Sequence, residues 1–80
     1  MQGFNLMISK GFDIVVLDVP SKENLVSEIY YCDRMWAEIS QETEDLLIQL
    51  YTYPRQEYWE FSFDEAQRIL EQAKNKLLEI

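Results

Sequence analysis

Two glutamates, Glu28 and Glu38, are the side chains whose types and spacing could support acid–base chemistry. They lie in two neighbouring β-like segments, so a hairpin would bring them close together. A pair of carboxylates can act as general acid and general base when a cleft holds the substrate between them. A chain of 80 residues offers little room for such a cleft. The favoured interpretation is a solvated acidic face on a protein that is not an enzyme.

Three further acids, Glu42, Glu44 and Asp45, crowd one short stretch and raise the alternative of a divalent-cation site. The spacing of an EF-hand loop is absent, so we interpret the stretch as an acidic turn. The chain has no histidine and one cysteine, Cys32, which excludes histidine-based triads, a zinc site and an internal disulfide. We therefore expect no metal and no cofactor.

The segment from Leu25 to Tyr51 must position these side chains, and its alternation predicts three β-strands. The expected strands are Val26–Tyr31, Trp36–Gln41 and Leu46–Thr52, joined by turns at Asp33-Arg34 and at residues 42–45. Upstream, residues 4–8 and 13–19 are also β-like, with a turn at Lys10-Gly11 and a connection at residues 20–24.

Alternation also predicts which side chains share a face of the sheet. The expected inner face carries Ile29, Tyr31, Ala37, Ile39, Leu46, Ile48 and Leu50. The expected outer face carries Glu28, Tyr30, Trp36, Glu38, Gln49 and Tyr51. A register shift of one residue would exchange the two sets.

After a loop at residues 53–56, the sequence predicts a short strand over Tyr58–Phe61 and then a helix. Trp59, Phe61 and Phe63 are expected to close the core. Ser62 followed by Glu65 forms a capping box, which marks the helix start. The apolar stripe of this helix is Ala66, Ile69, Leu70, Ala73, Leu77 and Ile80. We expect one α+β domain over residues 1–80, an antiparallel β-meander of four to five strands with one C-terminal α-helix packed on one face.

The net charge of −8 is concentrated in the middle of the chain, because residues 23–65 carry eleven acids and two bases. Repulsion disfavours nucleic acid and anionic membranes as partners and favours a basic protein. No secretory signal is visible at the start, and the longest apolar run, residues 14–17, is far too short to span a bilayer. A cytoplasmic protein is expected.

Three aromatic residues on the expected outer face, Tyr30, Trp36 and Tyr51, favour a binding surface. Tryptophan and tyrosine are enriched at binding hot spots, and carboxylates around them would orient a cationic partner. The alternative is that a loop or a second copy of the chain covers this face.

The strings EIYYCDRMWAEISQE, LLIQLY and YPRQEYWEFSFDEAQRILEQAKNKLL resemble small acidic bacterial immunity proteins. These are encoded beside the toxins that they neutralise, in contact-dependent inhibition and related polymorphic-toxin systems. The resemblance covers roughly residues 20–80 and implies a protein that binds a basic toxin domain, in particular a nuclease, and blocks it.

Charge and face, rather than the resemblance, indicate the expected partner-binding residues. The expected charged contacts are Glu28, Glu38, Glu42, Glu44, Asp45 and Glu57, with Tyr30, Trp36 and Tyr51 as anchors. Three alternatives remain open: a general protein–protein interaction module, a homodimer, and a nucleic-acid mimic that inhibits a DNA-binding protein.

Overall fold

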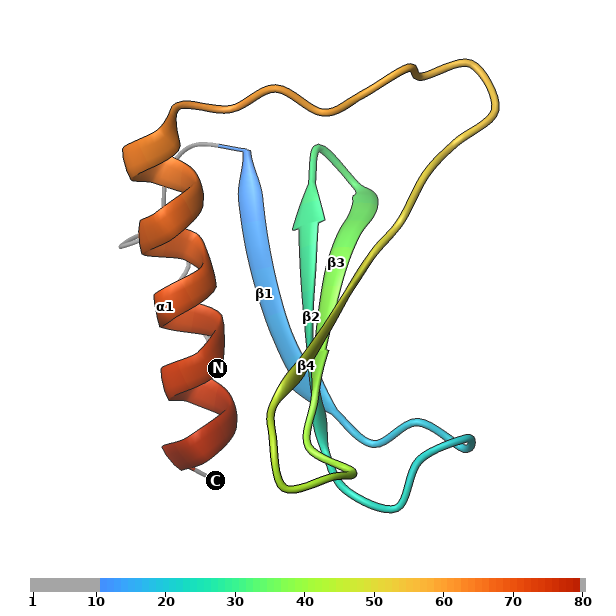
Figure 1. The fold of residues 1–80 in the computed structure, drawn as a ribbon, viewed down its shortest axis with the longest axis vertical. Coiled ribbons are helices and arrows are strands. Elements are labelled where there is room, and N and C mark those ends of the chain that lie inside the picture. Colours follow the sequence, from blue (N-terminus) through green and yellow to red (C-terminus); the bar gives the residue numbers. More distant parts are fainter. Residues whose placement is uncertain (1–10, 80) are drawn as a thin grey trace.

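An antiparallel sheet followed by a single helix makes up the described part of the chain, residues 11–79 of a computed structural model (Figure 1). The strands are β1 (Phe12–Leu17), β2 (Val26–Tyr31), β3 (Arg34–Ser40) and β4 (Leu47–Leu50), and the helix is α1 (Phe63–Glu79). The strands lie in sequence order in one open sheet, and every neighbouring pair is antiparallel. This arrangement confirms the predicted α+β meander with one C-terminal helix. Residues 4–8 and Lys10 lie outside the described residues.

The hairpin turn between β2 and β3 lies one residue earlier than predicted. Tyr31 and Arg34 are paired across it, so Cys32 and Asp33 form the two-residue loop and Arg34 begins β3. Both loop residues have positive φ, 49° and 69°, as a two-residue turn that matches the twist of the strands requires. Glycine is the usual residue for this conformation, and its absence here made the position of the turn hard to recognise.

The prediction that Trp36 lies on the outer face is wrong. The pairing of β2 with β3 shifts between Ile29 and Tyr30, which leaves Trp36 as the extra residue of a β-bulge. The bulge turns the indole towards the helix side of the sheet, where it is 7% exposed and packs in the core. Ile29, Tyr31, Ala37 and Ile39 lie on this inner face as predicted.

The core lies between the sheet and α1. Its buried side chains include Phe12, Ile14 and Ile29 of the sheet and Ile69, Ala73 and Leu77 of the helix. Ser62 caps the helix start as predicted: the amide of Glu65 donates to Ser62 Oγ at 3.3 Å. Ala66 and Leu70 continue the apolar stripe at its half-buried margin, whereas Ile80 lies outside the described residues. Phe63 does not close the core, because it is 76% exposed at the first position of the helix.

Residues 58–61 are not a strand, which corrects the prediction. The segment crosses one end of the sheet towards the helix without joining the ladder (Figure 1). Its side chains hold it there: Trp59 Nε1 donates to the carbonyl of Tyr51 at 3.0 Å. The Phe61 ring lies 5.0 Å from the rings of Phe12 and Trp36, centroid to centroid. Aromatic packing and one indole bond therefore replace strand pairing.

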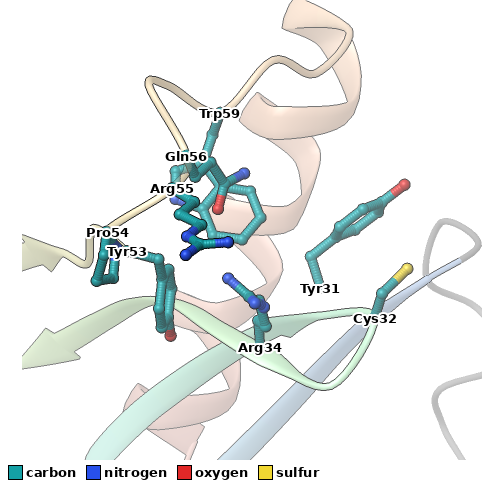
Figure 2. A pocket seen from close by; sticks show the side chains of 8 residues that line it. All are labelled: Tyr31, Cys32, Arg34, Tyr53, Pro54, Arg55, Gln56 and Trp59. Atoms are coloured by element: carbon teal, nitrogen blue, oxygen red, sulfur yellow. The ribbon is translucent and has the colours of Figure 1, made fainter.

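The turn at residues 53–56 packs against the beginning of β3 (Figure 2). Tyr53 donates its hydroxyl to the carbonyl of Met35 at 2.7 Å. The guanidinium carbon of Arg34 lies 4.7 Å from the centroid of the Tyr53 ring, a cation–π contact. The end of the β2–β3 hairpin and the segment after β4 are thereby held together.

The helix covers only part of the inner face, because α1 packs on β1 and β2. Among the described residues, β4 pairs only with β3 and forms one edge of the sheet. No helix within residues 11–79 is long and apolar enough to cross a membrane.

Candidate functional site

The carboxylates of Glu28 and Glu38 are brought together on the outer face of the sheet. The two residues are direct partners in the β2–β3 register, as a hairpin between their segments predicts. They are not solvated: Glu28 is 9% exposed and Glu38 is 6% exposed. Burial of two carboxylates side by side requires hydrogen-bond donors or cations beside them.

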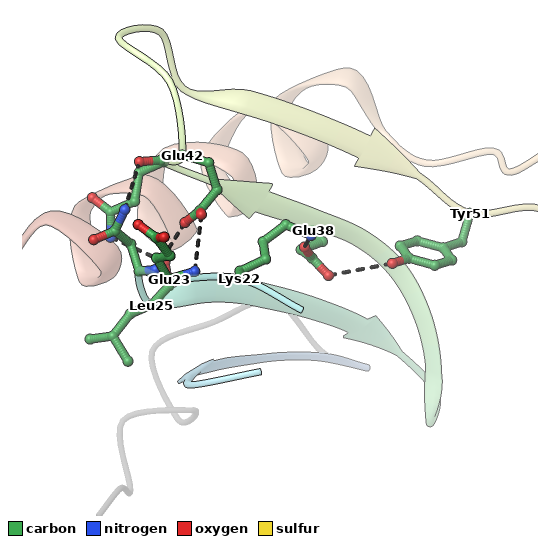
Figure 3. A network of polar contacts seen from close by, with 8 residues as sticks. Lys22, Glu23, Leu25, Glu38, Glu42 and Tyr51 are labelled. Atoms are coloured by element: carbon green, nitrogen blue, oxygen red, sulfur yellow. Dashed lines mark hydrogen bonds and ion pairs between the residues drawn. The ribbon is translucent and has the colours of Figure 1, made fainter. Parts of the chain in front are cut away.

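Each carboxylate has such a partner. The Tyr30 hydroxyl donates to Glu28 Oε1 at 2.8 Å. The Tyr51 hydroxyl donates to Glu38 Oε1 at 3.4 Å (Figure 3). Lys22 Nζ lies 3.2 Å from Glu38 Oε2 but outside hydrogen-bonding geometry, so this contact is an ion pair. The hydrogen bond to Glu28, together with burial, raises the pKa of Tyr30 to about 12. Burial is the main reason why the pKa of Tyr51 is raised, and the negative charge of Glu38 raises it further.

These contacts tie both carboxylates to side chains of the same protein, although Glu38 Oε2 has an ion pair and no hydrogen bond. Neither glutamate lines the cavity beside the β2–β3 hairpin or the groove beside β4. Tyr30 and Tyr51 are half-buried, and their hydroxyls bond to the glutamates.

Glu42 binds the connection between β1 and β2. Its carboxylate accepts from the backbone amides of Glu23, at 3.0 Å, and Asn24, at 2.9 Å (Figure 3). The hydrogen bonds from these two backbone amides hold the pKa of Glu42 below its usual value, and the bond from Glu23 has the larger effect. Gln41 adds a bond from Nε2 to the carbonyl of Leu25 at 3.1 Å. This predicted binding residue therefore joins the end of β3 to the β1–β2 connection.

Glu44 and Asp45 are exposed in the bend before β4, and Glu57 is exposed after the 53–56 turn. None of the three carboxylates forms an ion pair with another residue in the range 11–79. Within this range, no three cysteine, aspartate or glutamate side chains are grouped as a metal site requires. Glu44 and Asp45 thus remain available to a cationic partner.

The largest departure from the sequence prediction is at β4. Leu46, Ile48 and Leu50 were expected inside, but they are 37%, 47% and 62% exposed, and Leu47 is 48% exposed. Ile48 and Leu50 do pair with Ile39 and Ala37, so they lie on the inner face, beyond the cover of the helix. Ile48, Ile39 and Leu70 line a groove of about 270 Å³ between β4 and α1.

We call the exposed side chains of Leu46, Leu47, Ile48 and Leu50, together with Glu44 and Asp45, the β4 surface. An open strand edge with large apolar side chains is a template for pairing with another chain. The exposure of its apolar side chains was not predicted, because the run LLIQL is equally typical of a strand that a helix covers. The sequence did contain one relevant signal: it predicts a single helix, and one helix cannot cover four strands.

Comparisons of the chain with protein-family models, with curated proteins and with solved structures found no match.

Proposed function

We propose that this protein is an immunity protein that binds and neutralises a cognate bacterial toxin domain, and that it binds through the β4 surface. The proposal starts from the resemblance of residues 20–80 to acidic immunity proteins. The observation that carries it furthest is the exposure of three large aliphatic side chains on the edge strand β4 and of a fourth, Leu46, directly before it. Such a surface is costly in water unless a partner covers it.

The charge beside this strand supports a basic partner. Glu44 and Asp45 precede β4, are exposed and have no ion-pair partner in the described part of the chain. Carboxylates at the rim of an apolar patch attract a cationic surface and speed its capture, while the apolar centre supplies most of the affinity. A nuclease toxin, whose substrate site is basic, fits this chemistry, and inhibition requires no catalysis by the immunity protein.

Co-expression with the product of the adjacent gene tests the proposal. The expected result is that the chain protects cells from that protein and co-purifies with it in a 1:1 complex. The variant Glu44→Gln/Asp45→Asn should slow association and reduce its salt dependence, because it removes charge from the rim. Protection of growth without measurable binding would contradict the proposed mechanism.

A second candidate is an interaction module that forms a homodimer through β4. If two β4 strands pair antiparallel about their own midpoint, residues 42–45 of one copy lie alongside residues 52–55 of the other. The acids of the bend then face the segment that contains Arg55, and the strand itself, Leu47–Leu50, carries no charge to oppose pairing.

Sedimentation velocity of the purified protein distinguishes the two candidates. A monomer over a wide concentration range favours the toxin-binding proposal. A dimer that Ile48→Lys dissociates favours self-association through β4.

A further inference from the structure

A solvent-open cavity of about 660 Å³ lies where the β2–β3 hairpin meets the turn at residues 53–56, and it shares no lining residue with the β4 surface. Its lining includes two arginines, Arg34 and Arg55, and three aromatic residues, Tyr31, Tyr53 and Trp59. The volume falls within the roughly 300–1,000 Å³ that is typical of small-molecule sites.

The two guanidinium groups are the main feature of this cavity. In Figure 2 the guanidinium ends of Arg34 and Arg55 extend into the space between Tyr53 and Tyr31 and point towards one another. Neither arginine has a carboxylate within ion-pair distance among residues 11–79. Two cations that face one cavity repel each other, and an oxyanion between them would remove this repulsion and accept hydrogen bonds from both.

The aromatic rings form a preorganised wall beside the arginines. Trp59 lies edge-on to Tyr53 at 6.1 Å and to Tyr31 at 6.4 Å, centroid to centroid. Hydrogen bonds from Tyr53 to the Met35 carbonyl and from Trp59 to the Tyr51 carbonyl fix both rings. Rings that are fixed in this way can pack against a planar ligand at little cost in conformational entropy.

The turn that places Arg34 has an unusual backbone. Cys32 and Asp33, immediately before it, both have positive φ without being glycine. The two-residue hairpin turn requires both φ values, and it fixes the position from which Arg34 extends. The Cys32 thiol lies at the rim and raises the pKa of Tyr31.

We propose that this cavity binds a small ligand in which an oxyanion is joined to a planar ring, a nucleoside monophosphate or an aromatic carboxylate. The oxyanion lies between Arg34 and Arg55, and the ring packs against the Trp59 side of the cavity, because the Arg34 guanidinium already lies over the Tyr53 ring. The net charge of −8 repels anions at a distance, but physiological salt screens charges beyond about 8 Å. This inference is independent of the proposed toxin binding, because no residue of the β4 surface lines the cavity.

Titrations followed by amide NMR of the full chain test the proposal. The probes are adenosine 5′-monophosphate, benzoate, adenosine and inorganic phosphate. The monophosphate or benzoate should give saturable shifts in residues 31–34 and 53–59, and adenosine and phosphate should bind at least about tenfold more weakly, since each supplies half of the recognition. Saturation by the monophosphate alone assigns a phosphate ligand, and saturation by benzoate alone assigns a carboxylate.

Charge variants make the test specific to the two arginines. Arg34→Gln and Arg55→Gln should each weaken binding by about tenfold or more, which corresponds to about 1.4 kcal/mol. Lys74→Gln is the matched control, because it removes one positive charge outside the cavity, and it should leave binding unchanged. The proposal is wrong if neither ring-bearing anion gives saturable shifts, if the shifts map elsewhere, or if binding persists in both arginine variants. Binding of an acidic peptide without binding of either ring-bearing anion also overturns it.

Discussion

Glu28 and Glu38 lie directly opposite one another on β2 and β3, and both are almost fully buried. Tyr30 donates to one carboxylate, while Tyr51 and Lys22 bind the other. Two like charges directly opposite in a sheet are unfavourable, so this arrangement depends on those three partners. The face that the sequence suggested for partner binding is therefore largely occupied by contacts within the protein.

The two glutamates should respond unequally to removal of their charge. Glu28→Gln keeps an acceptor for Tyr30 and removes the repulsion, so the free energy of unfolding at pH 7 should rise by about 0.2–1 kcal/mol. Glu38→Gln also loses the Lys22 ion pair and should gain less. Urea unfolding of both variants measures the difference. A clear loss of stability in Glu28→Gln would mean that the pair is not repulsive.

Glu42 should contribute to the dependence of stability on pH. Its pKa is lowered in the folded state by backbone amides, so its stabilising effect is present above the unfolded value, near 4.5, and disappears as pH falls through the folded value. Glu42→Gln should lower the unfolding temperature at neutral pH and leave it less changed in acid. Thermal unfolding between neutral and acid pH checks this, with Glu44→Gln as control. A constant difference at every pH would contradict the role of the ionised carboxylate.

Trp36 should behave as a core residue and not as a surface anchor. Trp36→Ala should lower the free energy of unfolding by about 3–5 kcal/mol, because the indole is removed from the aromatic core. Tyr58→Ala, at a side chain that is 67% exposed, should change it by less than about 0.5 kcal/mol. Similar small effects at both positions would show that the bulge does not turn Trp36 inwards.

The β2–β3 turn should be stabilised by glycine. Asp33 has φ of 69°, and a left-handed conformation costs most residues other than glycine about 1–2 kcal/mol. Asp33→Gly should raise the free energy of unfolding by about 0.5–1 kcal/mol, and Asp33→Ala should lower it. Chemical denaturation distinguishes them. If alanine were tolerated better than glycine, Asp33 would not have a positive φ.

The sequence was sufficient for the elements with strong local signals. Ser62 and Glu65 mark the start of α1, and period-two alternation identifies β2 and its inner residues Ile29 and Tyr31. The sequence was insufficient where contacts between distant parts of the chain decide on which face a side chain lies. A bulge between paired strands reverses the face of Trp36, and nothing within the strand itself signals it.

In the candidate site, too, some features follow from the local sequence and others depend on contacts between distant segments. The acids Glu44 and Asp45 were predicted from charge and are exposed, whereas the exposure of Ile48 and Leu50 depends on where the helix lies over the sheet. Arg34 and Arg55 are 21 positions apart in the chain, and contacts of Tyr53 with Met35 and Arg34 bring their segments together. Their shared cavity therefore has no signature in the sequence.

The most direct test of the central claim is the dissociation constant for the toxin domain encoded beside this chain, compared between Ile48→Lys and Val15→Lys. Both variants place a lysine at an exposed aliphatic position on an edge strand, Ile48 on β4 and Val15 on β1. Binding through the β4 surface predicts that Ile48→Lys weakens the complex by about thirtyfold or more, the loss of about 2 kcal/mol that marks a hot spot. Val15→Lys should leave the constant unchanged. Equal affinities for the two variants, or a larger loss for Val15→Lys, would contradict the account.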